Sequence, residues 1–545
     1  MTRRNSTSKR LKGRRVAMKT TSPGDPGAAG QGSGQDIESS KKPGVPQAAE
    51  KGPSAPVLPE KCPSGAKAHA DIANFAARLK SCPVTKPVTK PSRIAFKPGF
   101  PAAWSAPEAS GSGVSTEKSA RAQDQPVEIE KPVYGGAFLA RAEGKAVFVP
   151  LTLPGERVRV RITQSKSGYS TAELTEILNP SLQRIRPACP HFGVCGGCNY
   201  QHTGYENQLA FKKEILRETL QRGGVEPPSE IGVISADPWV YRNRIRVAFD
   251  AAGNPGYRGR RSNAIVPIRE CPIAAPLLFK AANAVAEILQ RVPENLRPTE
   301  LQLFCNPDES ALLATFFAAE SAGVRLEPLA RALQEQIPAL QSAELASGGR
   351  PGHPPRTLAK WGASSIRYAA AGFDYRVDQG AFFQVNRWLV DALVESVTVG
   401  QTGKLAWDLF AGVGLFARKL TGRFERVVAV ESAPPAANAL EANLNGTTGT
   451  AVRAATLDFL RNAPEGDQPG LIVVDPPRTG LDAEITTLLA GIAAPTLVYV
   501  SCDPATLARD LRALIASGYR NESVTLADLF PQTFHLETVV HLSRN

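Results

Sequence analysis

From about residue 404 onward, short apolar runs alternate with segments of helical periodicity. The apolar runs cover residues 405–409, 427–431, 471–475 and 496–500, and the helical segments include 436–444 and 505–516. Apolar strands separated by amphipathic helices are typical of βαβ units, whose parallel strands are buried on both faces. The pattern predicts a doubly wound α/β sheet that ends in a hairpin over residues 523–529 and 536–542.

The segment before this pattern has a sequence pattern typical of a small β domain. Strand-like runs at residues 127–130, 146–150, 156–162 and 170–177 are separated by turns that contain glycine or proline. Several short strands at this spacing predict a barrel of the OB type. Such barrels commonly bind nucleic acid along a groove, although the fold alone proves no function.

Residues 189–375 read as mixed α/β structure with a helix at Tyr205–Gln221. The run Tyr241–Phe249 predicts a strand that leads through a Gly-Pro turn into a second one. Alternate residues of a strand share one face, and the arginines of this hairpin suggest a surface for RNA. The candidate RNA-binding residues are Arg242, Arg244, Arg246, Arg258 and Arg260. An ordinary solvated face is the alternative.

Charge is distributed very unevenly along the chain. The net charge is +13 over 545 residues, yet residues 1–120 alone carry 20 Lys and Arg against 8 Asp and Glu. The remainder holds 44 basic and 43 acidic residues. The first 122 residues are rich in Pro, Gly and Ser and lack periodicity, so we predict a disordered basic tail. It either attracts phosphates or serves as a solubilising extension.

Composition excludes several classes of protein. No apolar run is long enough to span a bilayer, and no apolar segment follows the basic N-terminus to form a secretory signal. Eight cysteines at uneven spacing do not form a disulfide framework, so we expect metal or catalytic use in a reducing cytoplasm. The default expectation for the oligomeric state is a monomer.

Four cysteines are candidate ligands of a metal ion or an iron–sulfur cluster. Cys189, Cys195 and Cys198 lie in one Gly-rich segment, and Cys271 follows far downstream. Four thiolates can close a tetrahedral zinc site or hold an iron–sulfur cluster. The neighbouring glycines let backbone amides approach sulfur, which favours a cluster only modestly. Unligated core cysteines are the alternative.

A Gly-rich turn follows the first apolar run of the α/β pattern. Asp408–Gly414 contains Phe410, Gly412 and Gly414, and Glu431 ends the next run. Glycines permit close approach of the backbone to a ligand, and a carboxylate one strand along can bind ribose hydroxyls. The last glycine of the dinucleotide fingerprint is replaced by Ala417, so S-adenosylmethionine fits at least as well as NAD. Asp458 ends the third strand pattern and is a candidate contact for the adenine.

A cysteine follows the fourth apolar run, in Ser501-Cys502-Asp503-Pro504. A helix N-terminus lowers the pKa of a thiol, and the helix predicted from residue 505 would activate Cys502 as a nucleophile. His535 and Glu537 on the final hairpin offer a base. A buried structural cysteine and a plain edge-strand charge are the alternatives.

These motifs together resemble the RNA 5-methyluridine methyltransferase family, in particular its ribosomal RNA branch with an N-terminal TRAM barrel. The resemblance covers residues 125–545 and rests on ordered motifs: the four cysteines, Phe383–Asn386, Asp408–Gly414, Asp475–Arg478, Ser501–Pro504 and His535–Thr538. It implies a disordered tail over 1–122, a TRAM-like OB barrel over 123–186, a central α/β domain with the cluster over 187–375, and a class I (Rossmann-like) methyltransferase domain over 376–545.

The resemblance also implies roles for individual residues. The four cysteines would hold a 4Fe–4S cluster, Cys502 would be the nucleophile and Glu537 the general base. Cofactor contacts are implied for Gln384, Phe410, Glu431, Asp458 and Asp475. Leu415 stands where some relatives carry a polar residue, and Ala411 where relatives often have cysteine.

The implied reaction begins with addition of the thiolate to carbon 6 of uracil, which makes carbon 5 nucleophilic toward the methyl donor. Glu537 would then remove the carbon 5 proton, and elimination would free Cys502. The uridine must leave its stack to be reached, as in base flipping. The expected substrate is RNA, most plausibly 23S ribosomal RNA. Transfer RNA, a 5-methylcytosine or exocyclic-amine methyltransferase, and a noncatalytic iron–sulfur assembly factor are the alternatives.

Overall fold

The computed structural model describes residues 124–348 and 355–544. The tail predicted over residues 1–122 lies outside the described residues. Within the described ranges the chain forms a closed barrel, a seven-stranded sheet, an eight-stranded sheet and a two-stranded hairpin. None of the helices in these ranges is long and apolar enough to cross a membrane.

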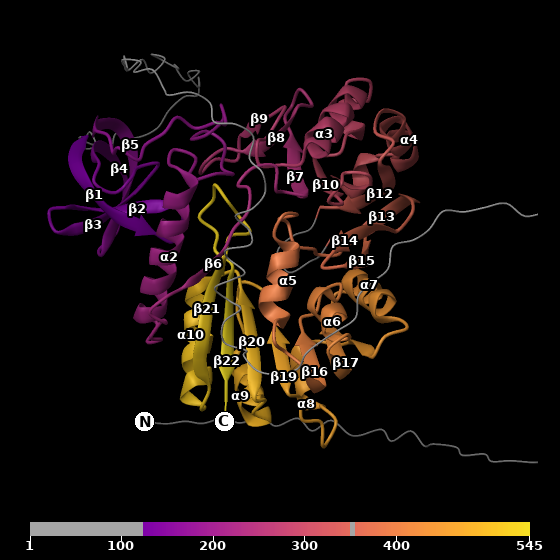
Figure 1. Ribbon diagram of the computed structural model, residues 1–545. Helices are drawn as coiled ribbons and strands as arrows, with labels where there is room; N and C mark the ends of the chain where they lie inside the picture. Colours follow the sequence, from indigo (N-terminus) through magenta and orange to yellow (C-terminus); the bar gives the residue numbers. More distant parts are fainter. Residues whose placement is uncertain (1–123, 349–354, 545) are drawn as a thin grey trace, which may run out of the picture. The chain divides into compact units, whose positions relative to one another are not determined.

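The predicted barrel is confirmed at the start of the described chain (Figure 1). Its strands close in the order β1-β2-β3-β5-β4. They are β1 (Gln125–Val133), β2 (Ala137–Ala142), β3 (Lys145–Pro150), β4 (Arg157–Ser165) and β5 (Tyr169–Asn179). Strand β2 was absent from the prediction because its short sequence, Ala-Phe-Leu-Ala-Arg-Ala, is nearly continuously apolar and lacks strict alternation.

The central region is built on the seven-stranded sheet, ordered β13-β12-β11-β10-β7-β8-β9. Helices α3 (Pro276–Leu289) and α4 (Leu326–Gln336) pack on it through a shared apolar core. The strands are β7 (Arg244–Phe249), β8 (Pro255–Arg258), β9 (Ile265–Pro267), β10 (Glu300–Cys305), β11 (Leu312–Ala318), β12 (Leu340–Ser347) and β13 (Thr357–Gly362). Two 3-10 turns, η1 (Glu294–Leu296) and η2 (Glu320–Ala322), and the hairpin β14 (Ser365–Ala370) and β15 (Phe373–Asp378) complete the region.

The eight-stranded sheet confirms the predicted α/β pattern and its terminal hairpin. Its order is β18-β17-β16-β19-β20-β22-β21-β6, and β22 runs antiparallel to both of its neighbours. The strands are β16 (Gly403–Leu409), β17 (Phe424–Glu431), β18 (Gly449–Arg453), β19 (Leu471–Val474), β20 (Thr496–Ser501), β21 (Arg520–Ala527) and β22 (Thr538–Ser543). The last strand, β6 (Gly232–Ile234), comes from the central region, so this sheet is not built from residues 376–545 alone.

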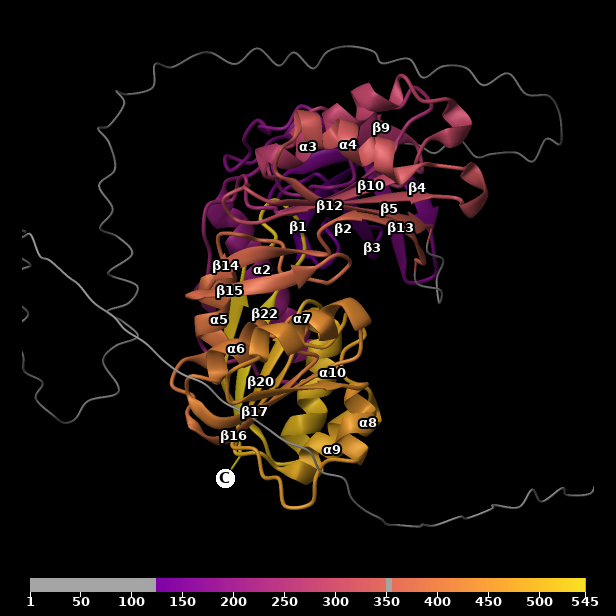
Figure 2. The ribbon, with the colours of Figure 1, turned by 90° about the vertical axis from the view of Figure 1, so that its right-hand side faces the viewer.

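Helices cover both faces of this sheet (Figure 2). Leu405, Trp407 and Leu409 point to one face and Ala406 to the other, as the period of two in a strand requires. One face is covered by α5 (Val390–Thr398), α6 (Leu415–Leu420) and α7 (Pro434–Leu444). The other is covered by α2 (Tyr205–Arg222), α8 (Thr456–Arg461), α9 (Ala483–Ile492) and α10 (Pro504–Ala516).

Candidate active site

The predicted chemistry gathers at the carboxyl edge of the eight-stranded sheet. Strand β16 lies between β17 and β19, so the chain order reverses there. In open α/β sheets this switch point opens a crevice beyond the strand ends, where ligands bind. The Gly-rich turn follows β16, Glu431 ends β17, Asp475 follows β19 and Cys502 follows β20. The topology therefore brings these predicted residues to one edge.

The Gly-rich turn has the backbone conformation that the prediction required. Phe410, Gly412 and Gly414 have φ values of 66°, 57° and 88°. A Cβ atom at Gly414 would lie 2.7 Å from Cδ1 of Leu440, which would have to shift, and residues with a side chain rarely adopt the φ of 88° found there. Glu431 braces the turn, because one carboxylate oxygen accepts from the Gly412 N–H (2.9 Å) and the other from the Ala433 N–H (2.7 Å). Each oxygen keeps a second lone pair for a ribose hydroxyl.

Asp408, at the end of β16, is a buried acid that the sequence analysis did not single out as a site residue. One carboxylate oxygen accepts from the Ala417 N–H at 2.8 Å, and the other finds no hydrogen-bond partner within the described part of the chain. Burial raises the pKa of Asp408 to about 8, and the charges of Asp475 and Glu431 add to the shift. Its signal in the sequence is an acid at the end of an apolar strand.

Strand register places the predicted nucleophile beside the predicted base. Ser501 of β20 pairs with Thr538 of β22, so Cys502 and Glu537 are the next residues outward on adjacent antiparallel strands. The side chain of Glu537 is buried, and burial together with the charge of Asp475 raises its pKa well above the ordinary value. Burial raises the pKa of Asp475 to about 7. Two carboxyl groups and a thiol thus lie close enough to act electrostatically on one another.

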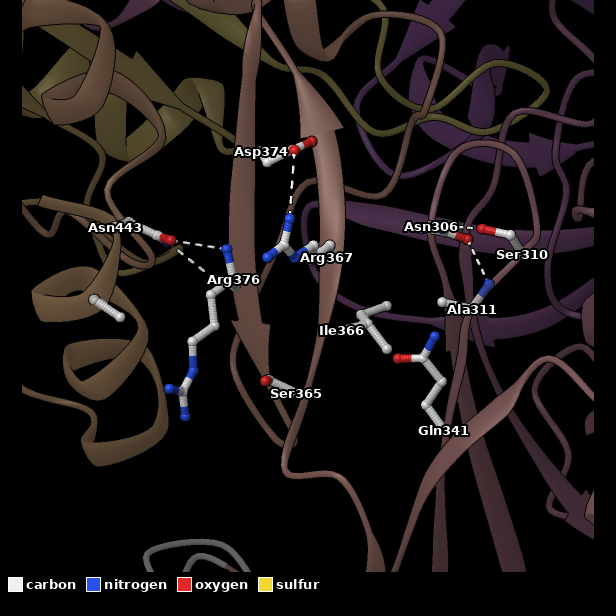
Figure 3. Close-up of a pocket in the computed structure, with 11 residues that line it drawn as sticks. Asn306, Ser310, Ala311, Gln341, Ser365, Ile366, Arg367, Asp374, Arg376 and Asn443 are labelled. Atoms are coloured by element: carbon white, nitrogen blue, oxygen red, sulfur yellow. Dashed lines mark hydrogen bonds and ion pairs between the residues drawn. The ribbon is translucent and has the colours of Figure 1, made fainter. Parts of the chain in front are cut away.

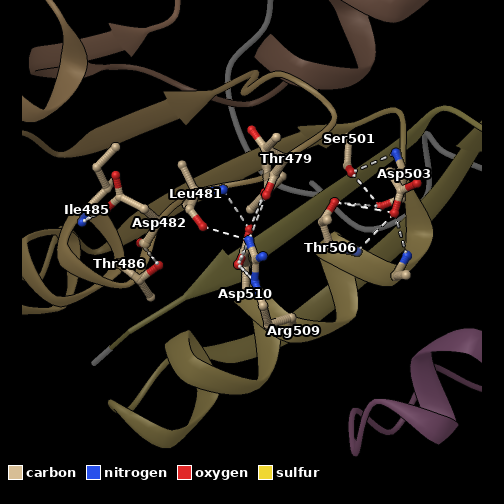
Figure 4. A network of polar contacts seen from close by, with 12 residues as sticks. Thr479, Leu481, Asp482, Ile485, Thr486, Ser501, Asp503, Thr506, Arg509 and Asp510 are labelled. Carbon is tan, nitrogen blue, oxygen red and sulfur yellow. Dashed lines mark hydrogen bonds and ion pairs between the residues drawn. The ribbon is translucent and has the colours of Figure 1, made fainter.

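The pKa of Cys502 differs from the prediction. Burial, followed by the charges of Glu537 and Asp475, raises it to about 11, and the opposing effect of Arg478 is smaller. The predicted lowering by the helix dipole was therefore wrong for the substrate-free protein. Asp503 caps α10 instead, because one of its carboxylate oxygens accepts from the N–H groups of Ala505 and Thr506 at 3.0 Å each. Those N–H groups are consequently directed at a carboxylate (Figure 4).

A polar network fastens the loop after Asp475 to helix α10 (Figure 4). Asp510 accepts from the Leu481 N–H at 2.8 Å, and Arg509 donates to the carbonyl oxygens of Thr479 and Leu481 at 2.9 and 2.7 Å. The Thr506 hydroxyl donates to the Arg478 carbonyl at 3.2 Å. Because α10 begins at Pro504, two residues after Cys502, the network fixes the Asp475–Arg478 loop relative to the thiol.

The four predicted ligand cysteines come together. Each has a raised pKa through burial, and the thiols of Cys189, Cys195, Cys198 and Cys271 act electrostatically on one another. The Gly197 N–H lies 3.4 Å from the sulfur of Cys195 and donates to it. No group of three or more His, Cys, Asp or Glu side chains in residues 124–348 and 355–544 has the compact arrangement that holds a metal ion.

Only some of the predicted RNA-binding arginines are exposed to solvent. Arg244 donates to the Ala381 carbonyl at 2.8 Å and lies over the ring of Phe304, and burial lowers its pKa to about 10. This guanidinium is committed to internal packing. Arg246 and Arg258 are exposed, but both pair with Glu300, at 2.6 and 3.4 Å. Arg242 donates to the Arg244 carbonyl, and partial burial lowers the pKa of Arg260.

Two predicted cofactor contacts lie apart from the strand ends. Gln384 is buried, and its backbone carbonyl accepts from the Asn243 side chain at 2.9 Å. Asp458 does not end a strand as predicted. It lies in the first turn of α8, where its side chain is 68% exposed. The preceding strand, β18, is short and ends at Arg453, which the apolar pattern did not reveal.

Sequence reasoning missed a contribution from the barrel. Tyr134, in the turn after β1, donates from its hydroxyl to Asp503 at 3.2 Å and makes an edge-to-face contact with Phe534, with ring centroids 5.5 Å apart. Arg478 lies 3.4 Å from Nδ1 of His535. The Tyr134-Gly-Gly turn is the signal that was available in the sequence, but its partner lies 369 residues away.

A cavity of about 830 Å³ is separate from this edge (Figure 3). It lies among the turn between β10 and β11, strand β12, the β14–β15 hairpin and α7, and its lining includes none of the predicted site residues. Asn443 connects it to the site, because its side-chain amide donates to the carbonyl oxygens of Val413 and Arg376 at 2.8 and 3.0 Å. The cavity therefore backs onto the Gly-rich turn.

Two protein-family models match parts of this chain, and several known proteins are similar to it. Residues 118–175 match the TRAM domain, and residues 468–545 match the tRNA (Uracil-5-)-methyltransferase family. The chain is 32% identical over 428 residues to an uncharacterized RNA methyltransferase of Aquifex aeolicus, covering 77% of this chain and 99% of that protein. It is also 32% identical over 437 residues to 23S rRNA (uracil(1939)-C(5))-methyltransferase RlmD of Chromohalobacter salexigens, covering 76% of this chain and 89% of that one.

A solved structure shares the fold. The tRNA (uracil-54, C5)-methyltransferase of Pyrococcus abyssi, crystallised with S-adenosyl-L-homocysteine, matches with a TM-score of 0.62 and 24% identity. The match covers 77% of this chain and 100% of that one.

Proposed function

This chain belongs to the RNA uracil-5 methyltransferase family and is an enzyme of that class, and on this premise we propose that it methylates 23S ribosomal RNA through a covalent adduct on Cys502. The observation that carries the mechanism is the strand register that puts Cys502 next to Glu537 at the carboxyl edge of the sheet. Relatives named as 23S rRNA enzymes, together with the TRAM match, support the choice of RNA.

The methyl donor in this proposal is S-adenosylmethionine, which supplies an electrophilic methyl group. Phe410, Gly412, Gly414, Glu431 and Asp475 would hold it at the crevice beyond β16, β17 and β19. Glu431, which braces the Gly-rich turn, retains lone pairs for the ribose. Gln384 and Asp458 complete the proposed contacts.

The proposed chemistry uses the thiol first and the carboxylate last. Cys502, as thiolate, forms a bond to carbon 6 of uracil, and the resulting electron density at carbon 5 takes the methyl group. Glu537 then removes the proton from carbon 5, and the electron pair expels the thiolate. Because the two side chains lie on adjacent strands, one flipped base can reach both.

We also propose that the four clustered cysteines hold a 4Fe–4S cluster. Their mutual electrostatic influence and the N–H donated to Cys195 suit such a group. The lack of a compact single-ion site in the described residues is compatible with it, because each thiolate of a cluster binds a different iron. Methyl transfer needs no redox step, so the expected role is to hold the segment. Iron and acid-labile sulfide analysis of anaerobically purified protein tests it.

The test of function is nucleoside mass spectrometry after incubation of unmodified 23S RNA and transfer RNA with labelled S-adenosylmethionine. We expect label in 5-methyluridine of 23S RNA, and none with Cys502→Ala. Label confined to transfer RNA would overturn the proposed substrate, and the family model named for tRNA makes that outcome the second candidate. Full activity in Cys502→Ala would overturn the covalent mechanism.

A further inference from the structure

Glu537 enters the active site from a loop that the eight-stranded sheet does not hold by itself. The loop spans residues 528–536 between β21 and β22 and is closed by a hydrogen bond from the Ala527 N–H to the Glu537 carbonyl at 2.9 Å. The position of the Glu537 carboxylate therefore depends on what fixes this loop.

Five consecutive carbonyl oxygens of the loop, from Asp528 to Gln532, accept hydrogen bonds from donors outside the sheet. The donors are the Asn386 amide for Asp528 and Leu529 (3.5 and 3.3 Å), the Lys212 ammonium for Phe530 (2.9 Å), the Tyr241 hydroxyl for Pro531 (3.0 Å), and the backbone N–H groups of Asn199 and Tyr200 for Gln532 (2.8 and 3.1 Å). Because consecutive carbonyl groups are held by hydrogen bonds, the path of the loop backbone is fixed.

Gln532 is the most constrained residue of this loop. It is a buried non-glycine residue with φ of 68°, in the left-handed region that a residue with Cβ rarely occupies. Its backbone N–H donates to the Gln208 side-chain oxygen at 2.9 Å, and the Gln208 amide donates to the Gln532 side-chain oxygen at 3.0 Å. Such a conformation persists where surrounding contacts over-determine it.

The same residue links the loop to the cysteine-bearing segment. Asn199, whose N–H donates to the Gln532 carbonyl, directly follows Cys198. We propose that Gln532 is a positioning residue, clamped by Gln208 and by the cysteine segment, that sets where Glu537 stands; this rests on the proposed function, in which Glu537 is the base. The cysteine segment thereby acts on catalysis through a hydrogen-bonded loop.

The proposal has a kinetic signature, because Glu537 is needed only after the carbon–sulfur bond and the new methyl group are in place. A displaced carboxylate slows removal of the carbon 5 proton, so methylated RNA stays bonded to Cys502. Unfolding or loss of RNA binding would reduce every step and leave no adduct. Accumulated adduct thus separates positioning from a general structural role.

The first variant is Gln208→Leu, which removes both hydrogen bonds of the clamp and leaves the loop sequence intact. The matched control is Gln221→Leu, the same change at an exposed position of helix α2. We expect Gln208→Leu to lower kcat at least about tenfold and to lower KM for RNA with it, because the slowed step follows adduct formation, and to accumulate an adduct seen as a protein band shifted in denaturing gels. The control should behave like the parent protein.

A second variant guards against a simple folding defect. Gln532→Gly removes the clamped side chain but accepts the left-handed backbone without strain, and the same adduct is expected. A lowered kcat without adduct in both folded variants, or unchanged kinetics, would overturn the proposal. Glu537→Gln, measured in parallel, must itself accumulate adduct. If it does not, the assignment of Glu537 as base is wrong, and the proposal falls with its premise rather than through Gln532.

Discussion

The thiol of Cys502 is predicted to be almost entirely protonated below pH 9 in the substrate-free protein, so that its reactivity keeps rising with pH. Its pKa of about 11 follows from burial and from the nearby carboxyl groups of Glu537 and Asp475. With that pKa, the thiolate fraction is on the order of 10⁻⁴ at pH 7 and 10⁻² at pH 9, a rise of about 100-fold. An unperturbed cysteine, with a pKa of about 8.5, would rise only about 25-fold and level off near pH 9.

The assay is alkylation of Cys502 by iodoacetamide without RNA, followed by mass spectrometry of the peptide that contains it. The rate reports the thiolate fraction, because the thiolate is the nucleophile. We expect a tenfold increase for each pH unit from 7 to 9, with no plateau. Glu537→Gln removes one cause of the shift and should give faster alkylation than the parent protein at pH 9, where carboxylates are most ionised.

A rise of only about threefold between pH 8 and 9 in the parent protein would refute the reasoning, because it would place the pKa near that of a free thiol. An equal rate in Glu537→Gln would show that the carboxyl group does not act on Cys502. Circular dichroism at each pH excludes unfolding as the source of any increase.

Further predictions concern stability and the cofactor turn. Lys212 and Asp528 form a fully buried ion pair at 2.5 Å, so Lys212→Met leaves the carboxylate of Asp528 buried without its partner. The variant should lose about 3–5 kcal/mol of unfolding free energy, measured by denaturant unfolding. A loss below about 1 kcal/mol would contradict this. In the folded protein the pKa of Asp408 is raised to about 8, so the contribution of this residue to stability falls as the pH rises from about 4 to 8. The melting temperature of Asp408→Asn should therefore rise relative to that of the parent protein between pH 6 and 8. A difference in melting temperature that stays constant over this range would contradict the prediction. Asn443→Leu releases the Val413 carbonyl and should weaken S-adenosylmethionine binding about tenfold by calorimetry, or about 1.4 kcal/mol, with Asn438→Leu on the same helix as the control.

Local pattern predicted the elements and their edge residues well. The apolar runs that became β16, β17, β19 and β20 were long enough to identify, and parallel topology then brought their carboxyl ends together. Strands β6 and β18 were not predicted because they are only 3 and 5 residues long. The misplacement of Asp458 followed directly from missing the end of β18.

Long-range contacts explain what the sequence did not predict. The thiol pKa depends on Glu537, which is 35 positions away in the chain, and the helix N-terminus expected to lower it is capped by Asp503. Arg244 shares its strand face with exposed Arg246, yet Ala381 and Phe304 enclose it. Alternation predicts which face a residue shares, and tertiary packing decides whether that face meets solvent.

Strand register and loop geometry each determine a different part of how the candidate site is assembled. The pairing of Ser501 with Thr538 is fixed by burial of Val500 and Val539 on the sheet, and a slip of one residue would turn Glu537 to the opposite face. Register therefore makes Glu537 a neighbour of Cys502, but a loop of nine residues precedes it and has several possible paths. The donors from Asn386, Lys212 and Tyr241 remove that freedom, and all three lie outside the sheet that carries the proposed catalytic pair. The eight-stranded sheet thus places Cys502 and Glu537 side by side, whereas the segments packed against it fix the loop that carries the proposed base.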